Sequence, residues 1–146
     1  MMPVSIPSHL LEIHQTHLPG FQPLVDSSTW RVALLSYAPD LAADQITEFQ
    51  RHNESDELFV LLAGECVLFL GEGEDSVTRI LAQKLEPFKF YNVKRRAWHS
   101  HVLSPDARIL IVENRDTSRA NSPRFNLTFE QRAEVVERSR QMLGTV

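Results

Sequence analysis

The chain has 146 residues, 42% of them hydrophobic and 23% charged, which is enough for one domain with a sizeable core. Its net charge of -4 argues against a nucleic-acid partner, because such partners usually require a basic face. The single cysteine, Cys66, excludes an internal disulfide, and no stretch approaches the roughly 20 apolar residues of a membrane span. The first residues do not resemble a signal peptide, so we expect a cytoplasmic protein with no membrane partner.

Short apolar strands separated by turns fill most of the chain, after an irregular segment over residues 1–20. The predicted strands cover residues 21–25, 29–37, 45–52, 58–63, 66–70, 77–82, 88–93, 98–103 and 108–113. Residues 113–124 are polar and predict a surface loop. Strands of this length without intervening helices indicate an antiparallel sandwich or barrel.

One helix is predicted after the strands, over residues 128–143. It opens with the pattern of a capping box at residues 128–131, and Gly144 is expected to end it. The apolar side chains that fall near one face are Phe129, Ala133, Val136 and Leu143. This stripe must dock either on the sheet or on a second subunit, and the sequence allows both.

A carboxylate stands at the start of a strand that is otherwise apolar. Because side chains alternate along a strand, Glu57 points to the same side as Phe59 and Leu61. An unpaired charge in such a place costs roughly 3–5 kcal/mol. The sequence therefore requires a partner for Glu57.

Histidines elsewhere in the chain are candidates for that partner. His99 and His101 alternate with Ser100, so their side chains lie on one face of a strand. His52 and Gln50 are also two residues apart, so their side chains lie on one face of another predicted strand. Imidazole nitrogen and carboxylate oxygen bind zinc, iron, manganese, nickel and copper. Two histidines and one carboxylate with open positions form the facial arrangement of many non-haem iron sites.

Two stretches of the sequence resemble the two motifs of the cupin superfamily. In the first motif a histidine pair precedes a glutamate and then a glycine, and here His52, Glu57 and Gly64 match. In the second motif a Pro-x-Gly turn leads to a histidine, which residues 93–99 match at His99. The resemblance covers most of the chain but identifies no subfamily.

The sequence departs from these motifs at several positions. Gln50 stands in place of the first histidine, Lys94 and Arg96 replace the Pro-x-Gly turn, and Leu103 replaces an asparagine. The resemblance implies one small RmlC-like cupin domain over all 146 residues. Its fold would be an all-β jelly roll, or double-stranded β-helix, with a barrel over about residues 21–114. An irregular N-terminal segment and one C-terminal α-helix complete the expected architecture.

The resemblance implies a mononuclear metal site on His52, Glu57 and His99, with Gln50 or water completing it and Fe, Mn, Ni or Zn as the ion. We expect His101 to be the catalytic acid or base beside this site, since its ordinary pKa lies near neutrality. Ligation of the metal by His101 is the alternative. A second alternative is a metal-free polar cluster in which protonated imidazoles neutralise the carboxylate.

The basic run over residues 94–96 indicates either a solvated turn or a clamp for an anionic substrate. Arg96 and Trp98 are accordingly the candidate substrate-binding residues. The predicted function is a metal-dependent dioxygenase, isomerase or lyase for a small organic acid or sugar-like molecule. A metal-free protein that binds a sugar or carboxylate, or an isomerase that uses the barrel histidines, is the alternative. A homodimer is also expected, as cupins commonly form.

Overall fold

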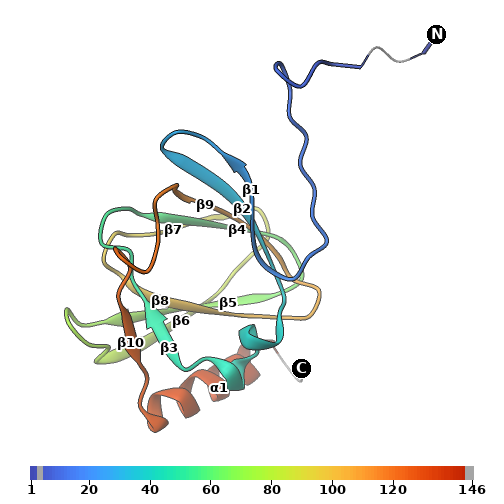
Figure 1. Cartoon of the computed structure of the whole chain (residues 1–146). Coiled ribbons are helices and arrows are strands. Elements are labelled where there is room, and N and C mark those ends of the chain that lie inside the picture. The colour runs from blue at the N-terminus through green and yellow to red at the C-terminus, as the bar shows by residue number, and fades with distance from the viewer. Residues whose placement is uncertain (3–4, 144–146) are drawn as a thin grey trace.

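The computed structural model describes residues 1–2 and 5–143, and its strands form two five-stranded sheets that face each other (Figure 1). Sheet A contains, in spatial order, β1 (Gly20–Asp26), β2 (Trp30–Ser36), β9 (Arg108–Asn114), β4 (Glu57–Ala63) and β7 (Phe90–Val93). Sheet B contains β10 (Arg124–Asn126), β3 (Glu48–Gln50), β8 (Trp98–Leu103), β5 (Cys66–Glu72) and β6 (Arg79–Lys84). Neighbouring strands are antiparallel, which confirms the predicted all-β jelly roll.

Two predicted segments differ from the structure. The strand predicted over residues 45–52 is too long, because the 3-10 helices Pro39–Leu41 and Ala43–Gln45 precede it and only the three residues of β3 are in strand. Strand β10 begins at Arg124, the last residue of the segment predicted as a loop, and pairs with β3 through Arg124 and Gln50. At three residues, β10 is too short to show the alternation by which a strand is recognised.

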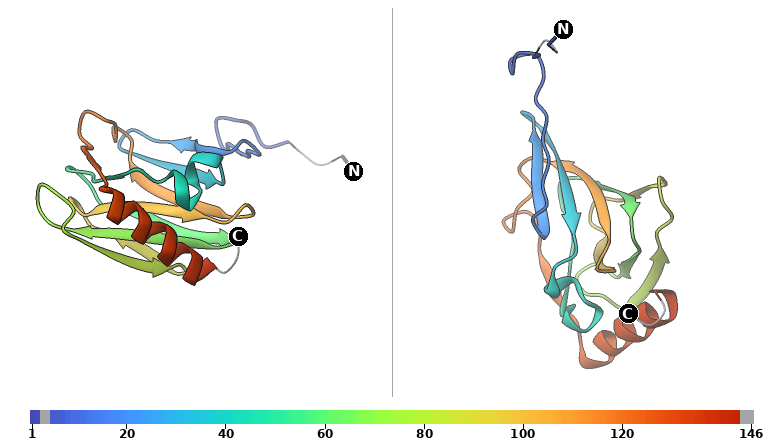
Figure 2. Two further views of the ribbon diagram at one scale, coloured as in Figure 1. Left: turned by 90° about the horizontal axis from the view of Figure 1, so that it is seen from below. Right: turned by 90° about the vertical axis from the view of Figure 1, so that its right-hand side faces the viewer.

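The two ends of the chain lie outside the sheets, one as an irregular arm and the other as a docked helix. Residues 5–19 leave the barrel as an extended arm, irregular as predicted (Figure 1). At the other end, helix α1 (Phe129–Leu143) lies along the outer face of sheet B in its own chain (Figure 2). The prediction that Gly144 ends the helix falls outside the described residues. Among the residues described, no helix has the length and apolar composition needed to cross a bilayer.

The docked face of α1 agrees with the predicted stripe only at Leu143. Its buried residues are Val135, Ser139 and Leu143, whereas Phe129 is 80% exposed and Val136 is 38% exposed. The capping box is confirmed, since Gln131 and Thr128 exchange side-chain and backbone hydrogen bonds of 2.9 and 3.1 Å.

Two apolar clusters hold the structure together. The inner cluster fills one end of the space between the sheets with Ala33, Leu35, Phe59, Leu61, Leu68, Leu103, Ile109 and Ile111. The outer cluster lies between sheet B and α1 and contains Phe49, Val67, Phe69, Trp98, Val102, Val135 and Leu143. The other end of the barrel is left to polar side chains.

The turn between β4 and β5 depends on Gly64. Its φ is +69°, and an added Cβ would lie 2.5 Å from the Cα of Ala107. We expect Gly64→Ala to lower the free energy of unfolding by about 3 kcal/mol, since left-handed strain of roughly 1–2 kcal/mol adds to steric overlap. Gly20→Ala is the matched control, because Gly20 has a φ of +75° but no atom within 4 Å of the added Cβ. Urea unfolding that finds equal losses in both variants would contradict the steric argument.

Candidate functional site

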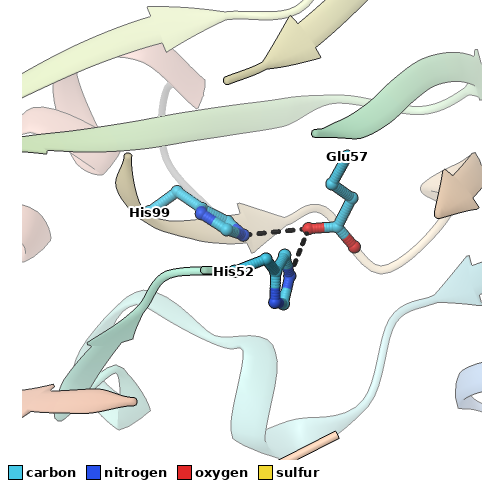
Figure 3. A group of neighbouring side chains, drawn as sticks. All are labelled: His52, Glu57 and His99. Carbon is cyan, nitrogen blue, oxygen red and sulfur yellow. Dashed lines mark hydrogen bonds and ion pairs between the residues drawn. The ribbon is translucent and has the colours of Figure 1, made fainter. Parts of the chain in front are cut away.

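Three side chains from separate segments meet at the polar end of the barrel (Figure 3). His52 follows β3, Glu57 begins β4, and His99 lies in β8 opposite Gln50 of β3. The Nε2 atoms of His52 and His99 each lie 2.9 Å from the same carboxylate oxygen, Oε2 of Glu57. Their side chains are 7%, 5% and 1% exposed in chain order, so the cluster is shielded from water.

The proton on His99 is assigned by its second contact. Nδ1 of His99 lies 2.9 Å from the carbonyl oxygen of Ala97, which can only accept a hydrogen bond. Nδ1 therefore carries a proton, and the Nε2 of a neutral ring presents a lone pair to Glu57.

The same assignment holds for His52. Its Nδ1 lies 2.7 Å from Oγ of Ser122, and that hydroxyl donates its own proton to Oδ1 of Asn121 at 3.1 Å. The Ser122 oxygen is thus left to accept from Nδ1 of His52, whose Nε2 also turns a lone pair toward Glu57. Two lone pairs and a carboxylate oxygen at this distance require a positive charge among them, either imidazolium protons or a metal ion.

The donor set fits a metal ion. Ligand bonds of about 2.0–2.2 Å place two ligands at right angles roughly 3 Å apart, which matches the 2.9 Å contacts. A carbonyl or hydroxyl on the other nitrogen of each imidazole is the usual support of a metal-binding histidine. Without a metal, protonated imidazoles would donate to Glu57 instead. Burial raises the pKa of Glu57, but such hydrogen bonds from His52 and His99 outweigh it and hold that pKa below its ordinary range.

A cavity of about 310 Å³ opens beside the cluster, and His52, Glu57 and His101 form part of its wall. The other polar side chains that line it are Arg31, Asp40, Gln50, Glu113, Thr117, Ser118, Arg119, Ser122 and Arg124. This volume suits a small molecule rather than a polymer. The cavity therefore brings a bound molecule against one side of the cluster.

His101 lies on this cavity wall but outside the three-residue cluster. Burial lowers its pKa to about 4, so the ring is neutral at pH 7. Its Nδ1 is buried and has no hydrogen-bond partner among the described residues. Such an atom is costly unless a ligand or water satisfies it.

Glu113, at the end of β9, is a site residue that the sequence reasoning missed. Its side chain is 3% exposed, and Arg31 holds it with contacts of 2.6 and 2.8 Å. Burial and the negative charge of Glu57 raise the pKa of Glu113 to about 7, although Arg31 opposes the shift. The sequence pattern that could have identified it is alternation along the strand. Glu113 lies two residues after Ile111 and four after Ile109, so its side chain points inward with theirs.

The raised pKa of Glu113 predicts a pH effect on stability. A carboxyl whose pKa is raised on folding contributes stability that is complete below its unfolded pKa, near 4.3, and is lost as the pH rises through about 7. Chelator-treated protein should therefore lose stability between about pH 5 and pH 8. Glu113→Gln should reduce this loss by about 1 kcal/mol in urea unfolding. Parallel pH profiles for the variant and the wild type would contradict the assignment.

Ser122 is the second residue that was missed, and it supports His52 from the loop between β9 and β10. Supporting residues of this kind typically contribute 10–100-fold to metal affinity. We therefore expect Ser122→Ala to weaken metal binding about 10–100-fold and Ser122→Thr to restore most of it, measured by competition with a metal indicator. Equal affinity in Ser122→Ala and the wild type would exclude this supporting role.

The remaining predicted site residues lie apart from the cluster. The Oε1 atom of Gln50 accepts a hydrogen bond from Arg124, so the structure gives it a contact other than a metal. Arg96 is exposed on the β7–β8 turn, where its φ is +69° at the position at which the motif has glycine. Its backbone N–H donates a hydrogen bond to the backbone carbonyl of His52. Trp98 faces the outer cluster, where it packs against Phe125.

Trp98 is therefore held by the outer packing, not by the cavity. Its indole N–H donates to the carbonyl of Glu74 at 3.2 Å, and the guanidinium of Arg51 lies 4.6 Å from its ring centre. Alternation along β8 explains the placement, since the neighbouring His99 points inward. Of the predicted residues, the structure brings together His52, Glu57 and His99, with His101 and Gln50 on the adjoining cavity wall.

Comparison with known proteins identifies the fold. No protein-family model matches the sequence, and no curated protein matches it. Among solved structures, a Streptomyces PAC13 variant with uridine is 14% identical and has a TM-score of 0.52, covering 92% of this chain and 98% of its own. Fe(II) HppE is 17% identical with a TM-score of 0.50, covering 64% of this chain and 48% of its own.

A third solved structure carries the family name. An RmlC-like cupin with a double-stranded β-helix fold, from Methanocaldococcus jannaschii, is 11% identical with a TM-score of 0.49, covering 72% of this chain and 91% of its own. The two structures with TM-scores of 0.50 and 0.52 confirm the expected double-stranded β-helix barrel as a fold, and no subfamily is specified.

Proposed function

We propose that this cupin-fold protein is an enzyme for a small molecule and holds one divalent transition-metal ion, Fe, Mn, Ni or Zn, on His52, Glu57 and His99. The observation that carries the proposal is the convergence of two imidazole Nε2 atoms on one buried carboxylate oxygen, each at 2.9 Å. When bound, the ion supplies Lewis acidity to a substrate oxygen. Because protons compete for the same nitrogens, metal affinity should fall as the pH is lowered.

The protein's own residues supply the rest of the site. Phe59 and Ile111 border the cluster and the cavity with apolar surface, which limits access of water. Glu113 holds or releases a proton near pH 7 and so is suited to general acid–base catalysis. His101, neutral and on the cavity lining, offers a hydrogen bond to the bound molecule or takes part in proton transfer.

Two relatives in fold support an enzymatic role. PAC13 is described as a nucleoside dehydratase, and HppE is described in its Fe(II) form. The second candidate function, a metal-free isomerase or dehydratase, rests on a different observation, which is the pairing of two proton-exchanging groups, Glu113 and His101, on one cavity wall.

Metal dependence of turnover distinguishes these two functions. Tag-free protein would be treated with a chelator, reloaded with iron, manganese, nickel or zinc, and assayed on small organic acids, sugars and nucleosides. We expect turnover of one of these classes to be lost on chelation and restored by one ion per chain. Turnover that is unchanged after chelation would instead support the metal-free enzyme. The expectations of a cytoplasmic homodimer without a nucleic-acid partner stay predictions.

A further inference from the structure

Two arginines share the wall of the cavity next to the cluster. Arg124 is the first residue of β10, and Arg119 lies in the loop before it. Arg119 is exposed, and no hydrogen bond or ion pair of its side chain is found among the described residues. Arg124 donates to the amide oxygen of Gln50, and its Nε forms a long ion pair of 3.8 Å with Oε1 of Glu48.

The two guanidinium groups belong to residues that line the same cavity. Burial lowers the pKa of Arg124, the negative charge of Glu48 raises it, and the positive charge of Arg119 lowers it. Two cations that line one cavity repel each other, and a bound anion relieves that repulsion. Guanidinium forks match the planar oxygens of carboxylates and the oxygens of phosphates.

The acidic residues that line the cavity form no ion pair with Arg119 or Arg124 among the described residues. Glu57 is bound by two histidines, and Glu113 is bound by Arg31. Asp40 also lines the cavity, where it is exposed. The positive charge of Arg119 and Arg124 is therefore not neutralised by the acids that line the same cavity.

His101 lines the same cavity as the two arginines. Its imidazole can exchange a hydrogen bond with a hydroxyl or carbonyl group of a molecule held there. The cavity of about 310 Å³ limits that molecule to a small one. Together these features specify a compact ligand with one oxyanion and at least one neutral oxygen.

We propose that Arg119 and Arg124 bind the carboxylate or phosphate group of a small oxygen-bearing substrate and thereby orient it toward the His52–Glu57–His99 cluster. This inference rests on the proposed function, because it names the substrate class of the same site. It concerns the arginines alone and does not require the metal for anion binding.

The test uses inorganic phosphate and acetate as probes on full-length, chelator-treated protein at low ionic strength. Binding would be followed by NMR through the side-chain Nε–H signals of the arginines. We expect saturable shifts in the wild type and affinity about 10–100-fold weaker in Arg119→Gln, since a hydrogen bond to a charged group contributes roughly that factor. Arg95→Gln is the matched control, because Arg95 is also exposed but does not line the cavity.

Each outcome bears on the proposal. Saturation by phosphate, acetate or both supports it and identifies the preferred oxyanion. No saturation by either probe, or equal affinity in Arg119→Gln and the wild type, would overturn it. Arg124→Lys, which keeps the charge and removes the fork, should also weaken binding and guards against a folding defect in one variant. Metal titration of the same samples separates this test from the proposed function, since Arg119→Gln should bind metal as the wild type does.

Discussion

Replacing Glu57 by glutamine should lower the affinity for a divalent metal ion by roughly 1,000-fold or more. The substitution preserves the size of the side chain but removes the negative charge of the three-residue ligand set. It also removes the oxygen toward which the Nε2 atoms of His52 and His99 both turn. The measurement is a calorimetric titration of chelator-treated, tag-free protein with zinc or manganese.

The matched control for this loss is Glu65→Gln. Glu65 is also a glutamate, but it pairs with Lys84 at 2.5 Å on the surface and does not line the cavity. We expect that variant to titrate like the wild type. If Glu57→Gln retained the wild-type affinity, the carboxylate would not be a ligand and the metal site would be wrongly placed.

Alanine variants of the two histidines in β8 should differ in which property they lose, metal affinity or turnover. His99 and His101 both lie in β8 and turn to the same face, but only His99 reaches Glu57. His99→Ala should therefore lose metal affinity by roughly the same 1,000-fold, because one of the few ligands disappears. His101→Ala should bind metal within about threefold of the wild type and lose turnover by roughly 100–10,000-fold, as expected for an acid–base group.

This pair of variants also tests the alternative ligand. The two histidines are neighbours on one face, so a general weakening of β8 would affect both variants, and circular dichroism would report it. Equal loss of metal affinity in the two variants, with intact folding, would make His101 a ligand. Equal retention of metal affinity in both would show that neither histidine is a ligand and would place the bound ion away from the cluster.

The central part of the site could be predicted because it follows from alternation along strands. The parity of Glu57 with Phe59 and Leu61 turned the carboxylate inward, and all three side chains are buried. The parity of His99 and His101 placed both imidazoles on the cavity side. Strand patterns of this kind are visible in one sequence because they repeat every second residue.

Residues that depend on the loop between β9 and β10 could not be predicted. Ser122 reaches His52 across 70 positions of sequence, and Arg119 reaches the cavity from a segment that shows no periodicity. The path of such a loop is set by contacts such as those of Asn121 with Asp116 and Ser118, which no spacing rule contains.

The buried face of helix α1 was predicted correctly only at Leu143, for a related reason. Ser139 occupies the buried face, and its hydroxyl is satisfied by donating to the carbonyl of Val135 at 2.7 Å. Such a buried polar residue interrupts the apolar pattern by which a docked face is recognised in a sequence. Phe129 and Val136 are apolar but exposed, so they indicate a face that does not dock. Trp98 was assigned to substrate because aromatic packing on the outer face of sheet B was not visible in the sequence.

The coordination of a bound ion tests the account most directly. X-ray absorption spectra would be recorded on tag-free protein reloaded with one zinc ion per chain, beside His99→Ala treated in the same way. The account predicts scattering from two imidazole rings together with oxygen ligands in the wild type, and fewer imidazoles in the variant. A zinc environment without imidazole in the wild type, or identical spectra for both proteins, would contradict it.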